Sequence, residues 1–284
     1  MIILNNLKDN KYLKKNNKIK IKYFPDGELN ITTRLKNNIK NVFLIFLINK
    51  NIEKEIFKIL MIIENLKKNG ISKIYLLIPY LRFSRQDKFI NSSPLKLFIK
   101  MLEKVKLKML ITLDIHSIQT LGFSDKLIIK NFSLFPKIIK ILKNIKKKII
   151  FTDMGGYNRY NKYLKNEDYF VFNKFREKKN IKILNKNIIK KKIKYIIFDD
   201  IIDSGNTMIE SIKKLKKSGI KNIYIFSIHP VFSNPNFFKN IKKIREVKKI
   251  FIFKTLKKKI KSKKIFFLRI KKKINNIIIE CLKK

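Results

Sequence analysis

Short β-branched runs that are typical of buried strands alternate along this chain with patterns of helical spacing. The strand-like runs lie at residues 42–48, 73–79, 109–113, 148–152, 195–199 and 223–228. Between the first two runs, apolar residues recur at the spacing of one helix face, at Ile56, Ile59, Leu60, Ile63 and Leu66. Alternation of this kind predicts an α/β fold in which mainly parallel sheets are flanked by helices.

A short segment occurs twice. Residues 67–75 read Lys-Lys-Asn-Gly-Ile-Ser-Lys-Ile-Tyr, and residues 216–224 read Lys-Lys-Ser-Gly-Ile-Lys-Asn-Ile-Tyr. Each copy is typical of a helix end, a glycine cap and the start of a strand. A length of 284 residues suits two domains of about 140 each. We therefore expect two tandem copies of one α/β unit, at residues 1–145 and 146–284.

The chain carries 69 basic and 20 acidic residues, a formal charge of +49 that would ordinarily suggest a nucleic-acid partner. The basic residues are spread evenly, however, and accompany heavy use of Ile, Asn and Phe, which is typical of an AT-rich genome. Tryptophan is absent and there is no RNA-binding aromatic signature. We expect no specific nucleic-acid partner, and the dispersed charge disfavours a polyanion-binding protein.

The only cysteine, Cys281, excludes an internal disulfide and a cysteine-based zinc site. Residues 1–7 turn polar too early for a secretory signal, and no run of about twenty apolar residues occurs. These features predict a soluble, cytoplasmic protein that is not associated with a membrane.

Residues 198–207, Phe-Asp-Asp-Ile-Ile-Asp-Ser-Gly-Asn-Thr, separate a strand-like run from a helical pattern. We expect them to form the strand-to-helix loop. Backbone N–H groups at the start of that helix would point outward, where a phosphate binds without a cationic side chain. These groups belong to Ser204, Gly205, Asn206 and Thr207.

The same loop contains three carboxylates, Asp199, Asp200 and Asp203. They would repel a phosphate but suit the hydroxyl groups of a neighbouring diol. The sequence therefore predicts a ligand with both a phosphate and a diol. The alternative is an ordinary helix cap with solvated acids.

Two other polar motifs follow strand-like runs. Leu-Asp-Ile-His ends at His116, and Thr-Asp-Met-Gly-Gly contains Asp153. A histidine nitrogen and a carboxylate oxygen, completed by phosphate oxygens and water, would suit Mg²⁺. The alternative for His116 is a structural role at a strand end.

Two motifs in the first half are weaker. Residues 23–28, Tyr-Phe-Pro-Asp-Gly-Glu, place an aromatic ring beside two acids on a turn, and residues 83–88, Phe-Ser-Arg-Gln-Asp-Lys, follow a strand-like run. Alone, the first indicates a β-turn and the second a solvated charged loop.

Taken in order, the motifs FPDGE, RQD, LDIH, TDMGG, FNKFR and FDDIIDSGNT, with residues 228–233 after them, resemble the ribose-phosphate diphosphokinase family, the phosphoribosyl diphosphate (PRPP) synthetases. The resemblance covers about Phe24 to Ser233. It implies two phosphoribosyltransferase-like (type I) domains. It also implies an enzyme that transfers the diphosphoryl group of MgATP to the anomeric hydroxyl of ribose 5-phosphate, giving PRPP and AMP.

The resemblance also implies roles for single residues. Lys174 and Arg176 match the catalytic cations, and His116 and Asp153 match the Mg²⁺ positions. The ATP site would consist of Phe24, Asp26, Gly27, Glu28, Arg85 and Gln86. Ribose 5-phosphate would bind Asp199, Asp200, Asp203, Ser204, Gly205, Asn206 and Thr207. A homo-oligomer, commonly a hexamer, is expected from the family.

Three features bear on this resemblance. Asn206 stands where the family usually has glycine, which matters if that position has a positive φ. The stretch between Gln86 and His116 is a few residues short. Residues 47–51, the first-half counterpart of the acidic loop, contain no acid, so only the second half should hold ribose phosphate.

Two alternatives remain within the same fold. A PRPP-consuming phosphoribosyltransferase would keep the acidic loop but would have no use for FPDGE and RQD. A non-catalytic regulatory homologue would be expected to lose Lys174, Arg176 or the metal pair.

Overall fold

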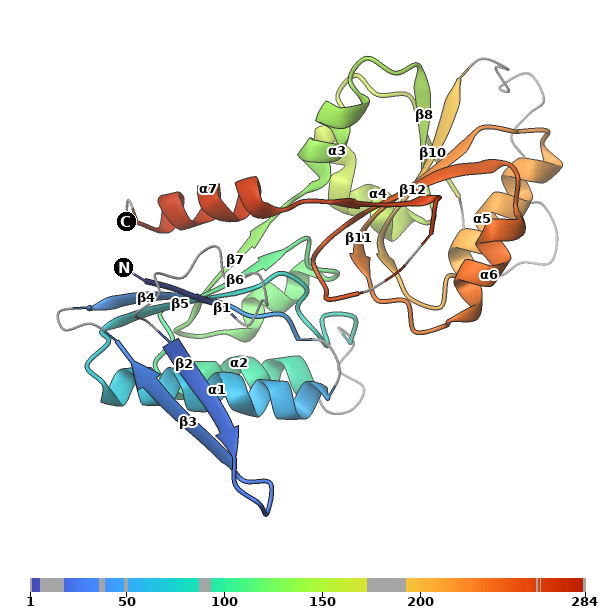
Figure 1. Ribbon diagram of the computed structural model, residues 1–284. Coiled ribbons are helices and arrows are strands. Elements are labelled where there is room, and N and C mark those ends of the chain that lie inside the picture. Colours follow the sequence, from blue (N-terminus) through green and yellow to red (C-terminus); the bar gives the residue numbers. More distant parts are fainter. Residues whose placement is uncertain are drawn as a thin grey trace. The chain divides into compact units, whose positions relative to one another are not determined.

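A computed structural model of the chain describes residues 2–5, 18–35, 39–48, 51–86, 93–172, 193–258, 260 and 262–282. The chain divides into two compact units, residues 1–132 and 133–284, each built on its own parallel sheet (Figure 1). This agrees with the predicted α/β class, with helices flanking mainly parallel strands.

The first unit contains a five-stranded parallel sheet. Its strands in spatial order are β1 (Ile2–Asn5), β4 (Asn41–Ile45), β5 (Lys73–Ile78), β6 (Met109–Leu113) and β7 (Ile128–Phe132). Its helices are α1 (Ile52–Lys68), α2 (Pro94–Lys104) and the 3₁₀ helix η1 (Ile118–Phe123). Buried apolar side chains of α1 and α2, such as Ile63 and Phe98, pack with strand residues such as Ile74 and Leu76 into one core.

A separate antiparallel hairpin, β2 (Lys18–Tyr23) and β3 (Leu29–Arg34), belongs to the same unit. Asn65 of α1 fixes this hairpin. Its side-chain amide donates to the carbonyl of Ile31 at 3.2 Å, and its carbonyl oxygen accepts from the Thr33 hydroxyl at 2.8 Å. The hairpin is therefore attached to α1 through side chains, and in Figure 1 its tip extends past that helix.

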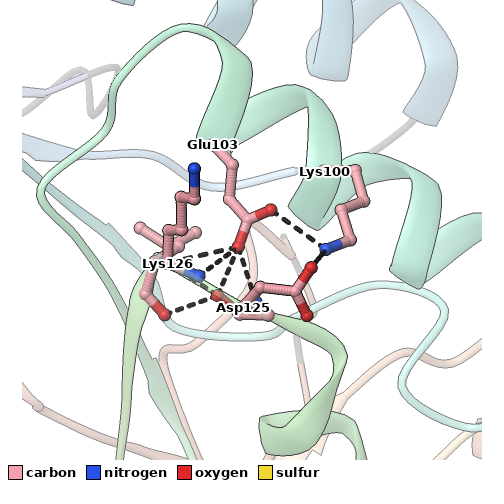
Figure 2. Close-up of polar contacts among 6 residues, drawn as sticks. Lys100, Glu103, Asp125 and Lys126 are labelled. Atoms are coloured by element: carbon pink, nitrogen blue, oxygen red, sulfur yellow. Dashed lines mark hydrogen bonds and ion pairs between the residues drawn. The ribbon is translucent and has the colours of Figure 1, made fainter.

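Glu103, in the last turn of α2, holds the loop that leads into β7 (Figure 2). Its Oε1 accepts hydrogen bonds from the Ser124 hydroxyl at 2.6 Å and from the backbone N–H groups of Asp125, Lys126 and Leu127 at 2.9, 2.9 and 3.2 Å. Its Oε2 lies 3.3 Å from the ammonium of Lys100. One carboxylate thus satisfies three consecutive backbone donors of a loop.

The second unit contains a six-stranded parallel sheet. Its strands in spatial order are β13 (Ile265–Leu268), β12 (Val247–Phe253), β11 (Ile223–Pro230), β10 (Lys194–Ile202), β8 (Lys147–Phe151) and β9 (Tyr169–Val171). Its helices are α3 (Phe135–Leu142), α4 (Met154–Tyr160), η2 (Asn161–Tyr163), α5 (Asn206–Lys217), α6 (Asn236–Lys243) and α7 (Lys271–Leu282).

The two faces of this sheet pack against different helices. Ile197 of β10 shares a core with Met208 of α5 and Phe237 of α6. The next residue, Phe198, points to the opposite face, where its ring centroid lies 4.8 Å from that of Tyr160 in α4. The alternation along β10 therefore sends neighbouring side chains toward α5 and toward α4 in turn.

The units divide earlier in the chain than the predicted boundary between residues 145 and 146. The reason is α3. Its Phe135 is fully buried, and its ring centroid lies 4.6 Å from that of Phe198 and 6.1 Å from that of Phe151 in the second unit. The boundary consequently falls before this helix, between Phe132 and Ser133.

The repeated sequence segment forms the same local structure in both units. Gly70 after α1 and Gly219 after α5 both have φ of 80°. In each case the glycine N–H donates to the carbonyl three residues before it, at Lys67 or Lys216. The N–H of the isoleucine that follows the glycine donates to the carbonyl five residues before it, at Leu66 or Leu215. The segments β4–α1–β5 and β10–α5–β11 are thus matching strand–helix–strand units.

In the part of the chain that the structure describes, every helix is too short or too polar to cross a membrane.

Candidate functional site

The FPDGE motif forms the tip of the hairpin in the first unit. Gly27, with φ of 92°, donates its N–H to the Phe24 carbonyl at 2.9 Å, and the Asp26 carboxylate accepts from the N–H of Glu28 at 3.0 Å. These bonds give the β-turn that Pro-Asp-Gly favours. The Phe24 side chain is 50% exposed, so an aromatic ring is presented to solvent at the end of the hairpin.

The position of this tip is fixed by cations of α1. The ammonium of Lys54 lies 4.7 Å from the ring centroid of Tyr23, the last residue of β2, and that of Lys58 lies 5.7 Å away. Lys58 also pairs with Glu55 at 2.7 Å. Cation–π contacts of this kind hold the residue that precedes Phe24 against the helix.

Arg85 and Gln86 lie on a turn that follows β5. Phe83 begins the turn with φ of 64°, an unusual conformation for a bulky residue, and its carbonyl accepts from the N–H of Gln86 at 2.9 Å. The Ser84 hydroxyl donates to the Leu81 carbonyl at 2.9 Å, and both Arg85 and Gln86 are exposed. The turn therefore directs these two polar side chains outward beyond the carboxyl end of a buried strand.

His116 follows the end of β6 in the same unit, as expected, and is half-buried. Asp114, with φ of 43°, donates its N–H to the Phe132 carbonyl, and the N–H of Ile115 bonds the side chain of Asn131 at 3.0 Å. Aspartate tolerates this left-handed conformation better than most residues. The strand end that carries His116 is thus fixed to β7.

In the second unit, Asp153 follows β8 and is the N-cap residue of α4. Its Oδ1 accepts from the N–H of Gly156 at 2.8 Å. The carboxylate therefore stands at the carboxyl end of an interior strand, where parallel α/β sheets place their ligands.

The structure corrects the predicted position of the first two aspartates of the acidic motif. They do not lie in the strand-to-helix loop, because β10 continues to Ile202. The extension is paired with β11, where Ile201 lies opposite His229 and Ile202 opposite Pro230. Asp199 and Asp200 are therefore strand residues, and only residues 203–205 separate β10 from α5.

The start of α5 also differs from expectation at one residue. Gly205 is the N-cap residue and has φ of 81°, whereas Asn206 is the first residue of the helix and is not among the residues of positive φ. A Cβ added to Gly205 would overlap the fully buried ring of Phe237. The strict requirement for glycine therefore lies at position 205, and Asn206 in place of glycine introduces no backbone strain.

The N-terminus of α5 suits an anion. Its N-cap residue is a glycine, which has no side chain to cap the helix, and the first helical residues include Asn206, which is exposed, and Thr207, which is half-buried. Helix N-termini of this form bind phosphates through N–H groups and the positive end of the helix dipole. Asp203 and Ser204 lie between this helix and the end of β10.

A residue that the sequence did not single out completes this region. Arg159 of α4 pairs with Asp200, with 2.8 Å between Nη2 and Oδ1, and their side chains are only 21% and 1% exposed. Burial lowers the pKa of Arg159, but the nearby Asp200, Tyr160 and Asp153 outweigh that effect and leave the pKa raised. Arg159 thus stays charged among the acids.

Asp199 has the opposite electrostatic environment. Burial raises the pKa of its carboxyl well above the usual range, and Asp200 and Asp153 raise it further, against a hydrogen bond with Thr152 that lowers it. Like charges in a poorly solvated site disfavour ionisation. Ionisation of Asp199 is therefore unfavourable in this site, and a ligand hydroxyl or a cation would make it less so.

A signal in the composition could have identified Arg159. The chain has 62 lysines and only 7 arginines, so an arginine stands out against the lysine-rich background. Arginine does what lysine cannot where a planar guanidinium must pair with a carboxylate in a buried position.

Among the described residues, no group of three or more His, Cys, Asp or Glu side chains is arranged to hold a metal ion. Mg²⁺ does not need such a cage, because it is usually bound through one or two carboxylates together with substrate phosphates and water. The hard carboxylate oxygens of Asp153 fit that role. Lys174 and Arg176, the predicted catalytic residues, lie outside the described residues.

The structure thus groups the predicted residues by unit. The first unit carries the hairpin tip, the Arg85–Gln86 turn and His116, and the second carries Asp153, the acidic end of β10 and the start of α5.

Comparison with known proteins identifies relatives of both units. Residues 9–105 match the family described as the N-terminal domain of ribose phosphate pyrophosphokinase. A ribose-phosphate pyrophosphokinase of Ureaplasma parvum is 29% identical over 252 residues, which cover 82% of this chain and 74% of the relative. The enzyme of that name from Buchnera aphidicola is 27% identical over 222 residues, 74% of this chain and 70% of the relative.

A solved structure agrees in fold. The phosphoribosylpyrophosphate synthetase of Mycobacterium smegmatis superposes with a TM-score of 0.84 and 17% sequence identity, over 99% of this chain and 98% of that one. The resemblance that the motifs indicated is thereby confirmed: this chain is similar in sequence, and in fold, to ribose-phosphate pyrophosphokinases.

Proposed function

We propose that this chain is a ribose-phosphate diphosphokinase, which transfers the diphosphoryl group of MgATP to the anomeric hydroxyl of ribose 5-phosphate and releases PRPP and AMP. The observation that carries the proposal is the junction of β10 and α5. There a helix N-terminus capped only by Gly205 adjoins Asp199, Asp200 and Asp203, so donors for a phosphate stand beside acceptors for a diol. The relatives named above support the assignment.

In this proposal the second unit binds ribose 5-phosphate. The backbone N–H groups of residues 204–207 hold the 5-phosphate. The carboxylates of Asp199, Asp200 and Asp203 accept hydrogen bonds from the ribose hydroxyls. Because the donors and acceptors come from one strand–helix junction, the sugar phosphate is held by a single rigid element.

The first unit binds ATP. Phe24 offers an exposed ring for stacking on the adenine. Asp26, Gly27 and Glu28 of the same hairpin tip form the part of the ATP site beside that ring. Arg85 and Gln86 are exposed on the turn after β5 and provide donors for phosphate oxygens.

Catalysis consists mainly of positioning and charge stabilisation, because diphosphoryl transfer needs no covalent intermediate on the protein. Lys174 and Arg176 stabilise the charge that accumulates on the transferred group and on the leaving AMP. Mg²⁺ would be held by Asp153 and, as the resemblance implies, by His116, and it would supply positive charge to the phosphates of ATP.

The test is to mix the purified protein with ATP, MgCl₂ and ribose 5-phosphate and to follow the products by phosphorus NMR. Equal amounts of PRPP and AMP are expected, and none without ribose 5-phosphate. Lys174→Ala, purified in the same way, controls for contaminating enzymes and should lose at least about a hundredfold in kcat. Consumption of added PRPP without release of AMP would instead identify a phosphoribosyltransferase.

We propose in addition that the protein is a homo-oligomer, as the resemblance implies. Sedimentation velocity measures this directly, and a monomer at the concentration of the assay would contradict it.

A further inference from the structure

Arg159 joins two strand ends of the second unit. It lies on the helix that follows β8, and its partner Asp200 lies near the end of β10, the strand beside β8. The two residues are 41 positions apart in the sequence. Their ion pair therefore connects the element that carries Asp153 to the element that carries the acidic motif.

The alternation along β10 explains why Asp200, rather than Asp199, meets the arginine. Phe198 and Asp200 share the face of the sheet that packs on α4, where Tyr160 and Arg159 lie. Ile197 lies on the other face, in the core that it shares with α5. Asp200 is thus turned toward α4, where its carboxylate meets the Arg159 guanidinium.

The guanidinium also lies close to Asp153. A Cβ built on Gly155 would stand 3.5 Å from Nη1 of Arg159 and 3.4 Å from Oδ1 of Asp153, so the two groups flank the same glycine. One cation thereby lies near the carboxylate proposed for the metal and pairs with a carboxylate proposed for the ribose.

Stability alone is a poor explanation of this pair. Removing two charges from water costs about as much as their attraction returns, and apolar replacements of buried pairs are often neutral or stabilising. The Nε of Arg159 is also buried without a hydrogen-bond partner. An arrangement of this kind is better explained by the geometry that it imposes on Asp200.

We propose that Arg159 is a positioning residue of the ribose site: by fixing Asp200 and the end of β10 it sets the affinity for ribose 5-phosphate. The inference rests on the proposed function, since it assigns Asp200 to that ligand. Arg159 acts through Asp200 and does not touch the transferred group. Substitution of Arg159 should therefore weaken the binding of ribose 5-phosphate more than the binding of ATP.

The experiment compares the full-length protein with R159M, R159K and a matched control, K147M. Lys147 of β8 pairs with Glu167 at the same 2.8 Å, and their side chains are 6% and 16% exposed, but the pair lies at the opposite end of the strand. Each protein is titrated calorimetrically with ribose 5-phosphate and assayed for kcat and both KM values, and its thermal unfolding is recorded.

For R159M we expect the Kd for ribose 5-phosphate to rise at least about tenfold, while the KM for ATP changes less than about twofold. R159K should be intermediate, about threefold weaker than wild type, because lysine keeps the charge but not the planar fork. K147M should lower the Tm and leave the Kd for ribose 5-phosphate unchanged.

A wild-type Kd in R159M, or an equal loss in K147M, overturns the inference. If R159M is too unstable to titrate, R159K decides, and a wild-type Kd in R159K overturns it as well. These outcomes are distinct from failure of the proposed function, in which the wild-type protein itself would not bind ribose 5-phosphate or form PRPP.

Discussion

Two carboxyl groups in this protein, Glu103 in the first unit and Asp199 in the second, have opposite shifts in pKa because their surroundings differ. Glu103 is surrounded by donors: a serine hydroxyl, three backbone N–H groups and the Lys100 ammonium (Figure 2). The hydrogen bond from Ser124, with that from the backbone of Lys126, holds the pKa of Glu103 well below its usual range. Burial raises the pKa of Asp199, and the neighbouring Asp200 and Asp153 raise it further.

The difference separates a structural acid from an acid suited to a ligand. The donors around Glu103 come from the chain itself, so folding alone stabilises its charge. The charge at Asp199 is stabilised less by its surroundings, which leaves interaction energy for a hydroxyl or a cation that arrives later. A substitution at Glu103 should therefore affect folding, and a substitution beside Asp199 should affect function as well.

The largest effect is expected for Asp200→Asn. The change leaves the buried Arg159 guanidinium without its charged partner, which costs roughly 3 kcal/mol of folding free energy. It also removes a proposed ribose acceptor, so kcat/KM for ribose 5-phosphate should fall at least about a hundredfold. Chemical denaturation and steady-state assays measure the two losses. Unchanged kcat/KM in a folded variant would place Asp200 with the structural acids.

Gly205→Ala should have the next largest effect, because the added Cβ overlaps the ring of Phe237 and φ is 81°. We expect a loss of more than about 2 kcal/mol in folding free energy, with weaker binding of ribose 5-phosphate.

Gly219→Ala is the matched control for that substitution. This glycine has nearly the same φ, 80°, and a Cβ there would meet nothing within 4 Å. It should lose only the cost of the left-handed backbone, about 1 kcal/mol, and leave ribose 5-phosphate binding unchanged. Equal effects of the two substitutions would contradict the close packing described for the start of α5.

Glu103→Gln tests the other side of the comparison. Three backbone N–H groups donate to one charged carboxylate oxygen of Glu103. The neutral amide oxygen of glutamine accepts these hydrogen bonds more weakly, so the Tm should fall by several degrees. The PRPP synthesis rate per folded molecule should stay within about twofold of wild type, because the residue serves only the loop before β7. Glu64→Gln, at an exposed pair with Lys68, is the control and should barely change the Tm.

The advantage of wild type over Glu103→Gln should also depend on pH. Because the pKa of Glu103 is lower in the folded than in the unfolded protein, its carboxylate stabilises the fold above the ordinary glutamate value of 4.5. That contribution is lost progressively as the pH falls below this value, because Glu103 then binds a proton more readily in the unfolded than in the folded protein. Thermal unfolding from pH 7 to pH 3 should show the two Tm values converging. A constant difference would mean that the charge of Glu103 is not what holds the loop.

The sequence predicted much of the fold because its central strands are buried on both faces. Such strands appear as apolar runs, and all six predicted runs correspond to strands. Edge and short strands, such as β9 and β13, lack this signal. The end of β10 was misplaced because its pairing with β11 is a tertiary contact that no local pattern reveals.

The candidate site shows the same limit. The aspartates and the glycine turn could be found because they are adjacent in sequence. Arg159 could not be linked to Asp200 by periodicity or by a local motif, since the partners meet only when β8 and β10 pair. Residues that recognise a ligand can be grouped in a motif, whereas those that position them come from elsewhere in the fold.

The smallest effect is expected for Asn206→Gly. If position 206 required a left-handed backbone, glycine there would stabilise the loop and improve ribose 5-phosphate binding. The structure instead places Asn206 at the first position of α5, exposed, with Gly205 taking the positive φ. Glycine at a helical position costs conformational entropy, so the variant should lose less than about 1 kcal/mol of folding free energy. Its Kd for ribose 5-phosphate should stay within about twofold of wild type by calorimetric titration, because the backbone N–H at this position is retained. A gain in both stability and affinity would show that Asn206 is strained, and it would move the critical turn of the acidic site from Gly205 to the next residue.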